Sequence, residues 1–280
     1  MASNDLLKAG ASLVFPTSGS YCSTHLGIGA HADDLEIMAY HGIAECYESD
    51  ECIFSGITVT DGVGSPQSEV EKLDREQLRV VRQSEQIAAA ELGKYGFIAQ
   101  LNYTSSEVKS AENEDVVQDI FNLLQKSKPQ VVYLHQPGDK HPTHLAVLQA
   151  SIEALQMMKV EGRPEQVYGC EVWRDLDWLS DEKKIYLPTD AYPELAEEII
   201  SVFQSQIRAG VAYDKGAIGR RIANGTFADP HIVREGDSFT LAMDLMPAVK
   251  GEISLCEMVA QEIEMFKESV GALWKSISDV

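Results

Sequence analysis

The alternation of apolar segments with amphipathic segments constrains the fold of this chain more than any other feature. Short apolar runs predict strands at 25–30, 52–60, 97–103, 130–136 and 166–173. Helical patterns lie between them at 33–48, 74–93, 113–129 and 141–158. Strands that alternate with helices form a mostly parallel sheet with helices on both faces. The sequence therefore predicts an α/β protein, a three-layer Rossmann-like fold with a mostly parallel sheet.

The last third of the chain is less regular. It contains a helical pattern at 192–207, a strand pattern at 238–245 and a second helical pattern at 255–274. We interpret residues 176–280 as a C-terminal α/β extension of a core at about 20–175, so that 1–280 is one domain.

Charge and composition exclude several classes of partner. The net charge is −21, from 44 acidic and 23 basic residues, which disfavours nucleic acids and anionic membranes as partners. Five cysteines without a CxxC pair disfavour a disulfide framework or a cysteine-rich zinc site. No apolar run approaches the roughly 20 residues of a membrane span, and the first residues lack a signal-peptide pattern. We expect a cytoplasmic protein that acts on a small molecule. The sequence leaves open whether the protein forms a homo-oligomer.

The segment "GIGAHADDLE" at 27–36 allows two interpretations. Gly27, Gly29 and Ala32 fit the G-x-G-x-x-G/A fingerprint of dinucleotide-binding proteins. That fingerprint places a pyrophosphate at the helix N-terminus, where Asp33 and Asp34 would repel it. The second interpretation, a metal site, fits these carboxylates better.

The metal interpretation starts from the spacing of His31 and Asp34. Residues three apart meet on one side of a first helical turn, so both can bind one cation. The segment "GDKHPTHLAV" follows the fourth predicted strand and brings His141 and His144 to the same rim, because ligands gather at the carboxyl ends of parallel strands. Against this, Asp is also a common helix cap and a lone His is usually a surface residue.

Together, "AHADDLE", "HPTH" and "RQSEQIAAAELG" resemble the PIG-L/LmbE-like family of zinc-dependent N-acetyl-sugar deacetylases, over about residues 24–150. The resemblance implies an N-acetylated sugar as substrate and Zn²⁺ as cofactor. It implies the following roles: His31, Asp34 and His144 as zinc ligands, Asp33 as general base, His141 as the group that stabilises the oxyanion or protonates the amine, Arg82 as a substrate contact, and Glu36 as a group behind the ligands.

The sequence departs from the family pattern at two positions. Ala32 replaces a common Pro, which changes no chemistry. Thr143 replaces the usual Asp of H-P-D-H and cannot supply the charge that favours a protonated His141. Asp139, close in sequence, and Asp61, at the end of the second strand, are candidate substitutes at the substrate site.

Other polar and aromatic residues carry weaker signals. His231 is a candidate substrate contact. Arg82 has a competing interpretation as a surface ion pair with Glu85. Three further sets are interpreted as structural. In 213–233, a solvated helix face is favoured over a site for sugar hydroxyls or phosphate (Arg220, Arg221, Asn224). Two tryptophans are interpreted as core rather than a sugar platform (Trp173, Trp178), and three histidines have no partner pattern (His25, His41, His135).

From these observations we predict a zinc-dependent hydrolase that releases acetate from an N-acetylglucosamine derivative or related glycoside. Iron(II) is an alternative metal at a His/His/Asp site. The alternatives are an amidase for a non-sugar N-acyl compound, a dinucleotide-binding protein, and a non-catalytic protein that binds metal or sugar.

Overall fold

A computed structural model describes residues 6–17, 19–64, 73–208, 210–228 and 237–278. Its strands are β1 (Ser12–Val14), β2 (His25–Gly29), β3 (Phe54–Thr60), β4 (Ile98–Tyr103), β5 (Val131–His135), β6 (Gln166–Cys170), β7 (Ile185–Pro188) and β8 (Phe239–Asp244). They form one eight-stranded sheet in the order β1-β4-β3-β2-β5-β6-β8-β7. The α/β architecture with a mostly parallel sheet is confirmed.

The middle of the sheet is parallel and its edges are antiparallel. Strands β4, β3, β2, β5 and β6 pair in parallel, and the registers Gly27↔Gly56 and Gly27↔Tyr133 place β2 at the centre. Strand β1 joins β4, and β8 joins β6 and β7, in antiparallel pairs. After β2 the chain continues to β3, and after β5 it continues to β6, so the two connections run towards opposite edges of the sheet. A crevice therefore opens between the carboxyl ends of β2 and β5, where ligands bind in folds of this kind.

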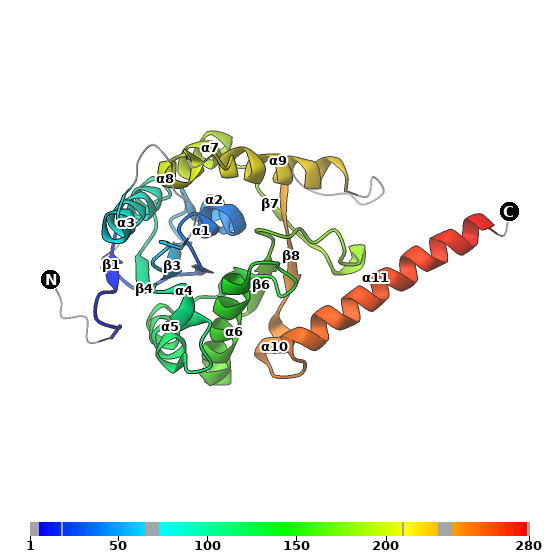
Figure 1. The fold of residues 1–280 in the computed structure, drawn as a ribbon, viewed down its shortest axis with the longest axis horizontal. Coiled ribbons are helices and arrows are strands. Elements are labelled where there is room, and N and C mark those ends of the chain that lie inside the picture. Colours follow the sequence, from blue (N-terminus) through cyan, green and yellow to red (C-terminus); the bar gives the residue numbers. More distant parts are fainter. Residues whose placement is uncertain (1–5, 18, 65–72, 209, 229–236, 279–280) are drawn as a thin grey trace.

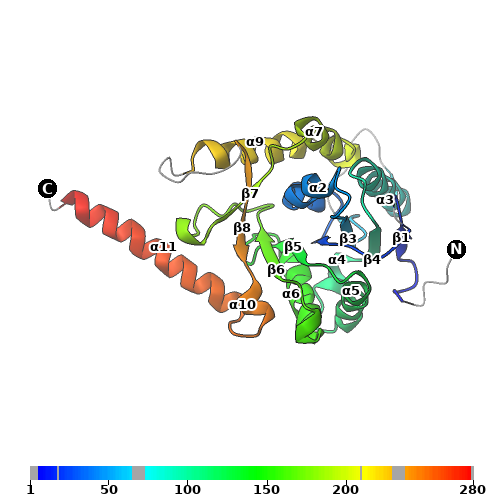
Figure 2. The same ribbon diagram turned by 180° about the vertical axis from the view of Figure 1, so that it is seen from behind.

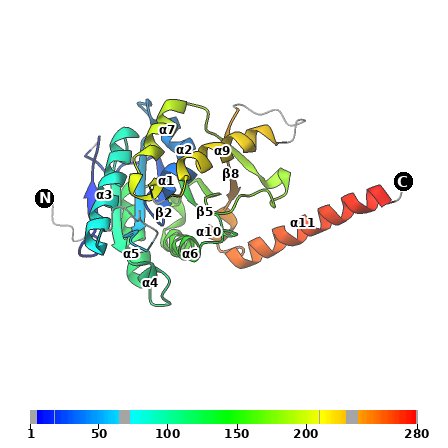
Figure 3. The ribbon, with the colours of Figure 1, turned by 45° about the horizontal axis from the view of Figure 1, so that its top comes forward.

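Helices cover both faces of the sheet (Figure 1, Figure 2). One layer contains α1 (Asp34–Met38), α2 (Tyr40–Cys46), α3 (Arg75–Leu92), α7 (Pro193–Ser201), α8 (Gln204–Ile207) and α9 (Tyr213–Thr226). The other contains α4 (Ser105–Val108), α5 (Glu114–Ser127), α6 (Pro142–Met157) and α10 (Met246–Val249). Short 3₁₀ turns lie at Val160–Gly162 and Asp181–Lys183. The final helix, α11 (Leu255–Ser278), extends away from both layers (Figure 3).

The predicted elements and the observed ones differ in a few places. The helix expected at 33–48 bends at Ala39, where hydrogen bonds from Ala39 N–H to the Leu35 carbonyl and from Ile43 N–H to the Ala39 carbonyl bridge α1 and α2. Strands β1 and β7 were not predicted, because edge strands of three and four residues carry too little periodicity. The extension adds β7 and β8 to the same sheet, while the domain limits stay a prediction.

Two apolar cores fill the space between the layers. One lies between the sheet and α5 and α6, and the other lies between the sheet and α1, α2, α3 and α7. Among the described residues, no helix has the combined length and apolar character that crossing a membrane requires.

Glycines on β2 and β3 let α1 approach the sheet. A Cβ atom on Gly27 would lie 2.9 Å from Leu35 Cδ2, and one on Gly56 would lie 2.6 Å from Leu35 Cδ1. A Cβ on Gly29 would lie 2.9 Å from Asp34 Cβ. These spacings explain the G-x-G pattern by close packing of α1 and its Asp34, with no need for a dinucleotide.

Candidate metal centre and active-site cavity

The turn between β2 and α1 brings His31, Asp33 and Asp34 to the carboxyl end of the central strand. Asp33 adopts a left-handed backbone conformation with φ of 85°. The His31 N–H donates to Asp34 Oδ2 at 2.7 Å, which closes the turn and holds the carboxylate beneath the imidazole. The expected meeting of positions i and i+3 is therefore observed.

Three groups from the segments that follow β2 and β5 lie close together at the carboxyl edge of the sheet. His31 Nδ1 lies 3.3 Å from Asp34 Oδ2 and 3.2 Å from His144 Nε2, and His144 Nε2 lies 3.5 Å from Asp34 Oδ1. Ligand atoms about 2.1 Å from a tetrahedral zinc are separated by roughly 3.4 Å. The two distances to Asp34 end on different oxygens. Among the described residues, two overlapping sets have single ligand atoms within 4.8 Å of one another, namely His31, His141 and His144, and Asp34, His135 and His144. This cluster could hold a divalent metal, and three protein ligands leave a fourth position for water or substrate.

Asp139 supports this set from behind. Its Oδ2 accepts hydrogen bonds from His144 Nδ1 at 3.4 Å and from the Trp173 N–H at 3.1 Å. A carboxylate on the far nitrogen fixes the tautomer that leaves Nε2 free for a metal. Burial lowers the pKa of His144 to about 4, so this imidazole is neutral and ready to ligate at neutral pH.

His141 lies beside the three candidate ligands without a carboxylate partner. Its ring packs edge-on against His31 with centroids 5.0 Å apart, and Trp173 stacks on it at 5.8 Å. Among the described residues no group hydrogen-bonds to its buried Nδ1. Burial and the neighbouring His31 lower the pKa of His141, which favours its neutral form. The lowered pKa of His141 agrees with the presence of Thr143 where the family pattern has an Asp.

Asp33 faces the same cavity as the candidate ligands and is 5% exposed. Burial raises the pKa of its carboxyl well above the usual range, and the neighbouring Asp34 and Glu36 carboxylates raise it further. A carboxylate with a raised pKa is a better proton acceptor, which suits a general base.

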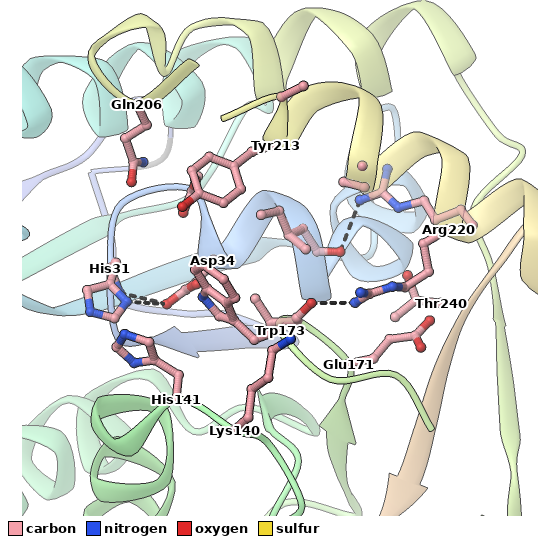
Figure 4. A pocket seen from close by; sticks show the side chains of 17 residues that line it. His31, Asp34, Lys140, His141, Glu171, Trp173, Gln206, Tyr213, Arg220 and Thr240 are labelled. Atoms are coloured by element: carbon pink, nitrogen blue, oxygen red, sulfur yellow. Dashed lines mark hydrogen bonds and ion pairs between the residues drawn. The ribbon is translucent and has the colours of Figure 1, made fainter. Parts of the chain in front are cut away.

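The cavity has a volume of about 330 Å³ and runs along the carboxyl ends of β2, β5 and β6 under α9 (Figure 4). His31, Asp34 and His141 lie at one end, and Glu171, Arg220 and Thr240 lie at the other. Trp173 lies between the two groups. Pockets of roughly 300 Å³ and above hold small molecules, so the cavity suits a substrate the size of one or two rings.

Comparison with known proteins agrees with the motifs. Residues 26–155 match the family model described as PIG-L, GlcNAc-PI de-N-acetylase. This part of the chain belongs to the PIG-L family. No curated protein matches the chain.

Several solved structures share the fold of this chain. The N,N'-diacetylchitobiose deacetylase from Pyrococcus horikoshii is 19% identical with a TM-score of 0.61, over 78% of this chain and 84% of that one. The deacetylase Dbv21 for A40926 pseudoaglycone is 16% identical with a TM-score of 0.57, over 79% and 96%. GalB, a 4-carboxy-2-hydroxymuconate hydratase from Pseudomonas putida KT2440, is 15% identical with a TM-score of 0.61, over 80% and 96%. At these identities the likeness shows the fold alone.

Several residues expected at the substrate site lie outside this cavity. Arg82 is 2% exposed, donates to the Gly62 carbonyl and lies near Asp33, so it is not the exposed surface pair considered from the sequence. Arg82 and Asp61 line a separate small cavity of about 10 Å³. Asp139 lies behind His144. His231 falls outside the described residues.

Glu36 and Thr143 are buried and stay predictions as supporting residues. Glu36 Oε1 accepts from Gln86 Nε2 at 2.9 Å and from the Tyr95 hydroxyl at 2.8 Å. Burial raises its pKa to about 7. Its side chain therefore anchors α1 to α3 rather than contacting the cavity.

The site also contains His135, which the sequence indicated as a structural residue without a partner pattern. His135 is fully buried at the end of β5, stacks on His144 with centroids 4.0 Å apart, and lies 3.4 Å from Asp34 Oδ2. Its Nε2 also accepts the Ala30 N–H at 3.0 Å, which ties it to the β2 turn. Its position near the carboxyl end of the strand predicted at 130–136 was the available signal.

Proposed function

We propose that this chain is a metal-dependent deacetylase that hydrolyses the N-acetyl group of an amino sugar and releases acetate. Zinc is the proposed metal, iron(II) its alternative, and an N-acetylglucosamine derivative the proposed substrate. One observation carries the proposal: His31, Asp34 and His144 lie 3.2 to 3.5 Å from one another, and His31 and Asp34 line the same cavity as Asp33 and His141. The PIG-L match supports the substrate class.

The residues of the site have separate roles in the proposed hydrolysis. A divalent metal held by His31, Asp34 and His144 supplies Lewis acidity. Asp33 accepts the proton of the water that attacks the amide carbonyl, and the raised pKa of its carboxyl suits this role. His141 donates a hydrogen bond to the oxyanion as the carbonyl becomes tetrahedral.

The proton for the departing amine comes from Asp33 in this scheme. A protonated Asp33 has just received a proton next to the scissile bond, whereas His141 is neutral at neutral pH and lacks a carboxylate that would stabilise its imidazolium. The replacement of the family's Asp by Thr143 thus moves the acid role from His141 to Asp33.

The first test combines metal content with acetate release. Purified wild type should contain about one zinc or iron per chain and release acetate from N-acetylglucosamine compounds, and His144→Ala should lose both. His41→Ala is the matched control, because His41 contacts the Pro188 carbonyl away from the cavity and its loss should spare both readouts.

Two results would refute the proposal. A folded wild-type protein that takes up no zinc contradicts the metal site. A metal-loaded protein that releases no acetate across sugar and non-sugar N-acyl compounds contradicts deacetylation, and because one protein of this fold is a hydratase, hydration substrates would be assayed next.

A further inference from the structure

The two long helices of the C-terminal extension differ in which side chains they bury. Helix α9 carries Arg221, which is 4% exposed and donates to the Glu36 and Ile37 carbonyls, so the solvated helix face expected from the sequence is wrong for this residue. Helix α11 does the reverse, because many of its apolar side chains are exposed. The proposed deacetylation uses no residue of α11, so the exposed apolar side chains need another explanation.

Only the start of α11 is anchored to the body of the protein. Met258 is buried in one of the two apolar cores, and Glu262 is buried and forms an ion pair with Lys183. From residue 263 onward the helix, which we term the arm (residues 263–278), leaves the body of the protein (Figures 1 to 3). At about 1.5 Å per residue, the arm is roughly 24 Å long.

One face of the arm is apolar and exposed. Six large side chains of the arm are between 38% and 67% exposed, namely Ile263, Phe266, Val270, Leu273, Trp274 and Ile277. If each has about 200 Å² of surface, the six together expose roughly 600 Å². The largest apolar patch on a typical monomer is about 300–600 Å², and patches at or above this size mark interaction sites. The arm therefore has the surface of a helix that binds a partner.

The arm would be a weak helix without a partner. An isolated helix of about 15 residues is marginal in water even when it is rich in Ala. Gly271 lies in the interior of the arm, and Gly and β-branched residues both lower helix propensity. The exposed ion pair between Glu264 and Lys267, at 2.8 Å, adds little. Packing of the apolar face against a partner would supply the missing stability.

The order of the apolar residues indicates that the partner is a helix of the same kind. They recur at alternating spacings of three and four residues, which is the a/d repeat of a coiled coil. The a positions are Cys256, Ile263, Val270 and Ile277, and the d positions are Val259, Phe266 and Leu273. The repeat thus covers three heptads of α11. Ile or Val at a combined with Leu at d favours two parallel strands.

The a/d face is free of the contacts that anchor the helix. Met258 and Glu262, which contact the body of the protein, occupy heptad positions c and g. At about 100° per residue, these positions lie roughly a quarter turn from the middle of the a/d face. Cys256, at the first a position, is exposed. A second helix can therefore lie along the a/d face while the contacts of Met258 and Glu262 stay in place.

The charges favour a second copy of this chain over a membrane. The arm has two glutamates and two lysines, so it is neutral in a chain of net charge −21. The e and g positions that flank its a/d face are Lys267, Ser269, Trp274 and Ser276. No row of like charges therefore opposes the pairing of two identical arms. Membrane-surface helices are usually rich in Lys and Arg, which the arm is not.

We propose that α11 pairs with α11 of a second copy as a parallel, two-stranded coiled coil, so that the protein is a dimer. A two-fold axis relates the copies, so each a residue meets its counterpart in the other copy. Together the two apolar faces offer on the order of 1,200 Å², the lower limit for a specific interface. This inference is independent of the proposed deacetylase function, because α11 contributes no residue to the cavity.

Sedimentation of the full chain tests the pairing. Wild type should sediment as a dimer at micromolar concentration. Leu273→Glu places a charge at a d position and should weaken dimerisation at least about tenfold, so that this variant sediments as a monomer. Ala272→Glu is the matched control, because it adds the same charge at the exposed c position and should leave the dimer intact. Unchanged near-ultraviolet circular dichroism would show that the body is folded in both variants.

A thiol crosslinker tests the parallel order. In a parallel pair the two Cys256 side chains face each other, whereas in an antiparallel pair they would lie roughly 30 Å apart at opposite ends. Cys22 is also exposed, so the experiment uses Cys22→Ser. A short bismaleimide should link this variant into covalent dimers. The double variant Cys22→Ser/Cys256→Ser is the control and should stay unlinked.

Three results would overturn the proposal. The first is a monomeric wild type, including one that instead binds phosphatidylcholine vesicles through the arm. The second is a Leu273→Glu variant that dimerises as well as wild type, because another surface would then hold the copies together. The third is a wild-type dimer that Cys256 does not crosslink, because the two helices would then not be parallel.

Discussion

Asp139 offers the sharpest test of the metal centre, because it touches two histidines and no part of the cavity. Its Oδ1 accepts from the His141 N–H at 2.9 Å, and its Oδ2 accepts from His144 Nδ1 and the Trp173 N–H. In Asp139→Asn one oxygen becomes an amide nitrogen that can only donate. Whichever way the amide turns, at least one of these N–H donors loses its acceptor.

The magnitude follows from that loss. A buried donor left unsatisfied costs about 1–3 kcal/mol of unfolding free energy. His144 also loses the carboxylate that orients its ring, and loss of such a partner typically weakens metal binding about 10- to 100-fold. We therefore expect Asp139→Asn to fold, with lower stability, and to bind zinc one to two orders of magnitude more weakly.

Zinc affinity is measured by competition with a chromophoric chelator, and stability by urea unfolding of the metal-free protein. Asp119→Asn is the matched control, since Asp119 is 6% exposed and accepts from the Lys8 N–H at 3.1 Å and the Tyr103 hydroxyl at 2.8 Å away from the site. Because both donors bond to Oδ2 of Asp119, the amide oxygen of this variant can accept both, so it should lose less stability than Asp139→Asn and keep wild-type zinc affinity. Equal zinc affinity in Asp139→Asn and wild type would show that Asp139 does not position His144.

Three further predictions follow from the same geometry. Asp33→Asn should lower kcat for acetate release about 10²- to 10⁴-fold at unchanged metal content, and near-normal turnover would remove Asp33 as the base. Leu35→Ala should lower the unfolding free energy by about 2–5 kcal/mol in urea, because Leu35 fills the space over Gly27 and Gly56, while exposed Leu92→Ala should change it by less than about 0.5 kcal/mol. Removal of the metal by a chelator should lower the melting temperature. If free zinc was a thousandfold above its Kd, the lost stabilisation is about 4 kcal/mol. Asp33→Asn should keep this shift in melting temperature and His144→Ala should lose it.

The fold was largely predictable because hydrophobic periodicity is a local property. The helix at 74–93 and the strand at 97–103 each have enough residues for the period to stand out, and α3 and β4 confirm them within a residue or so. Strands β1 and β7 were missed because their pairing with β4 and β8 is what makes them strands. The bend at Ala39 carries no Pro or Gly that would mark it.

The amino-acid sequence by itself determined the elements of the candidate metal centre: His31 and Asp34 share one turn, and the "HPTH" segment must reach the same rim once the strands are parallel. The tertiary structure alone decided what surrounds them. His135 entered because β5 lies beside β2, and Glu171, Arg221 and Thr240 meet because antiparallel β8 and helix α9 return to the end of β6. Such groupings depend on burial and on contacts between distant segments, and neither leaves a periodic pattern in the chain.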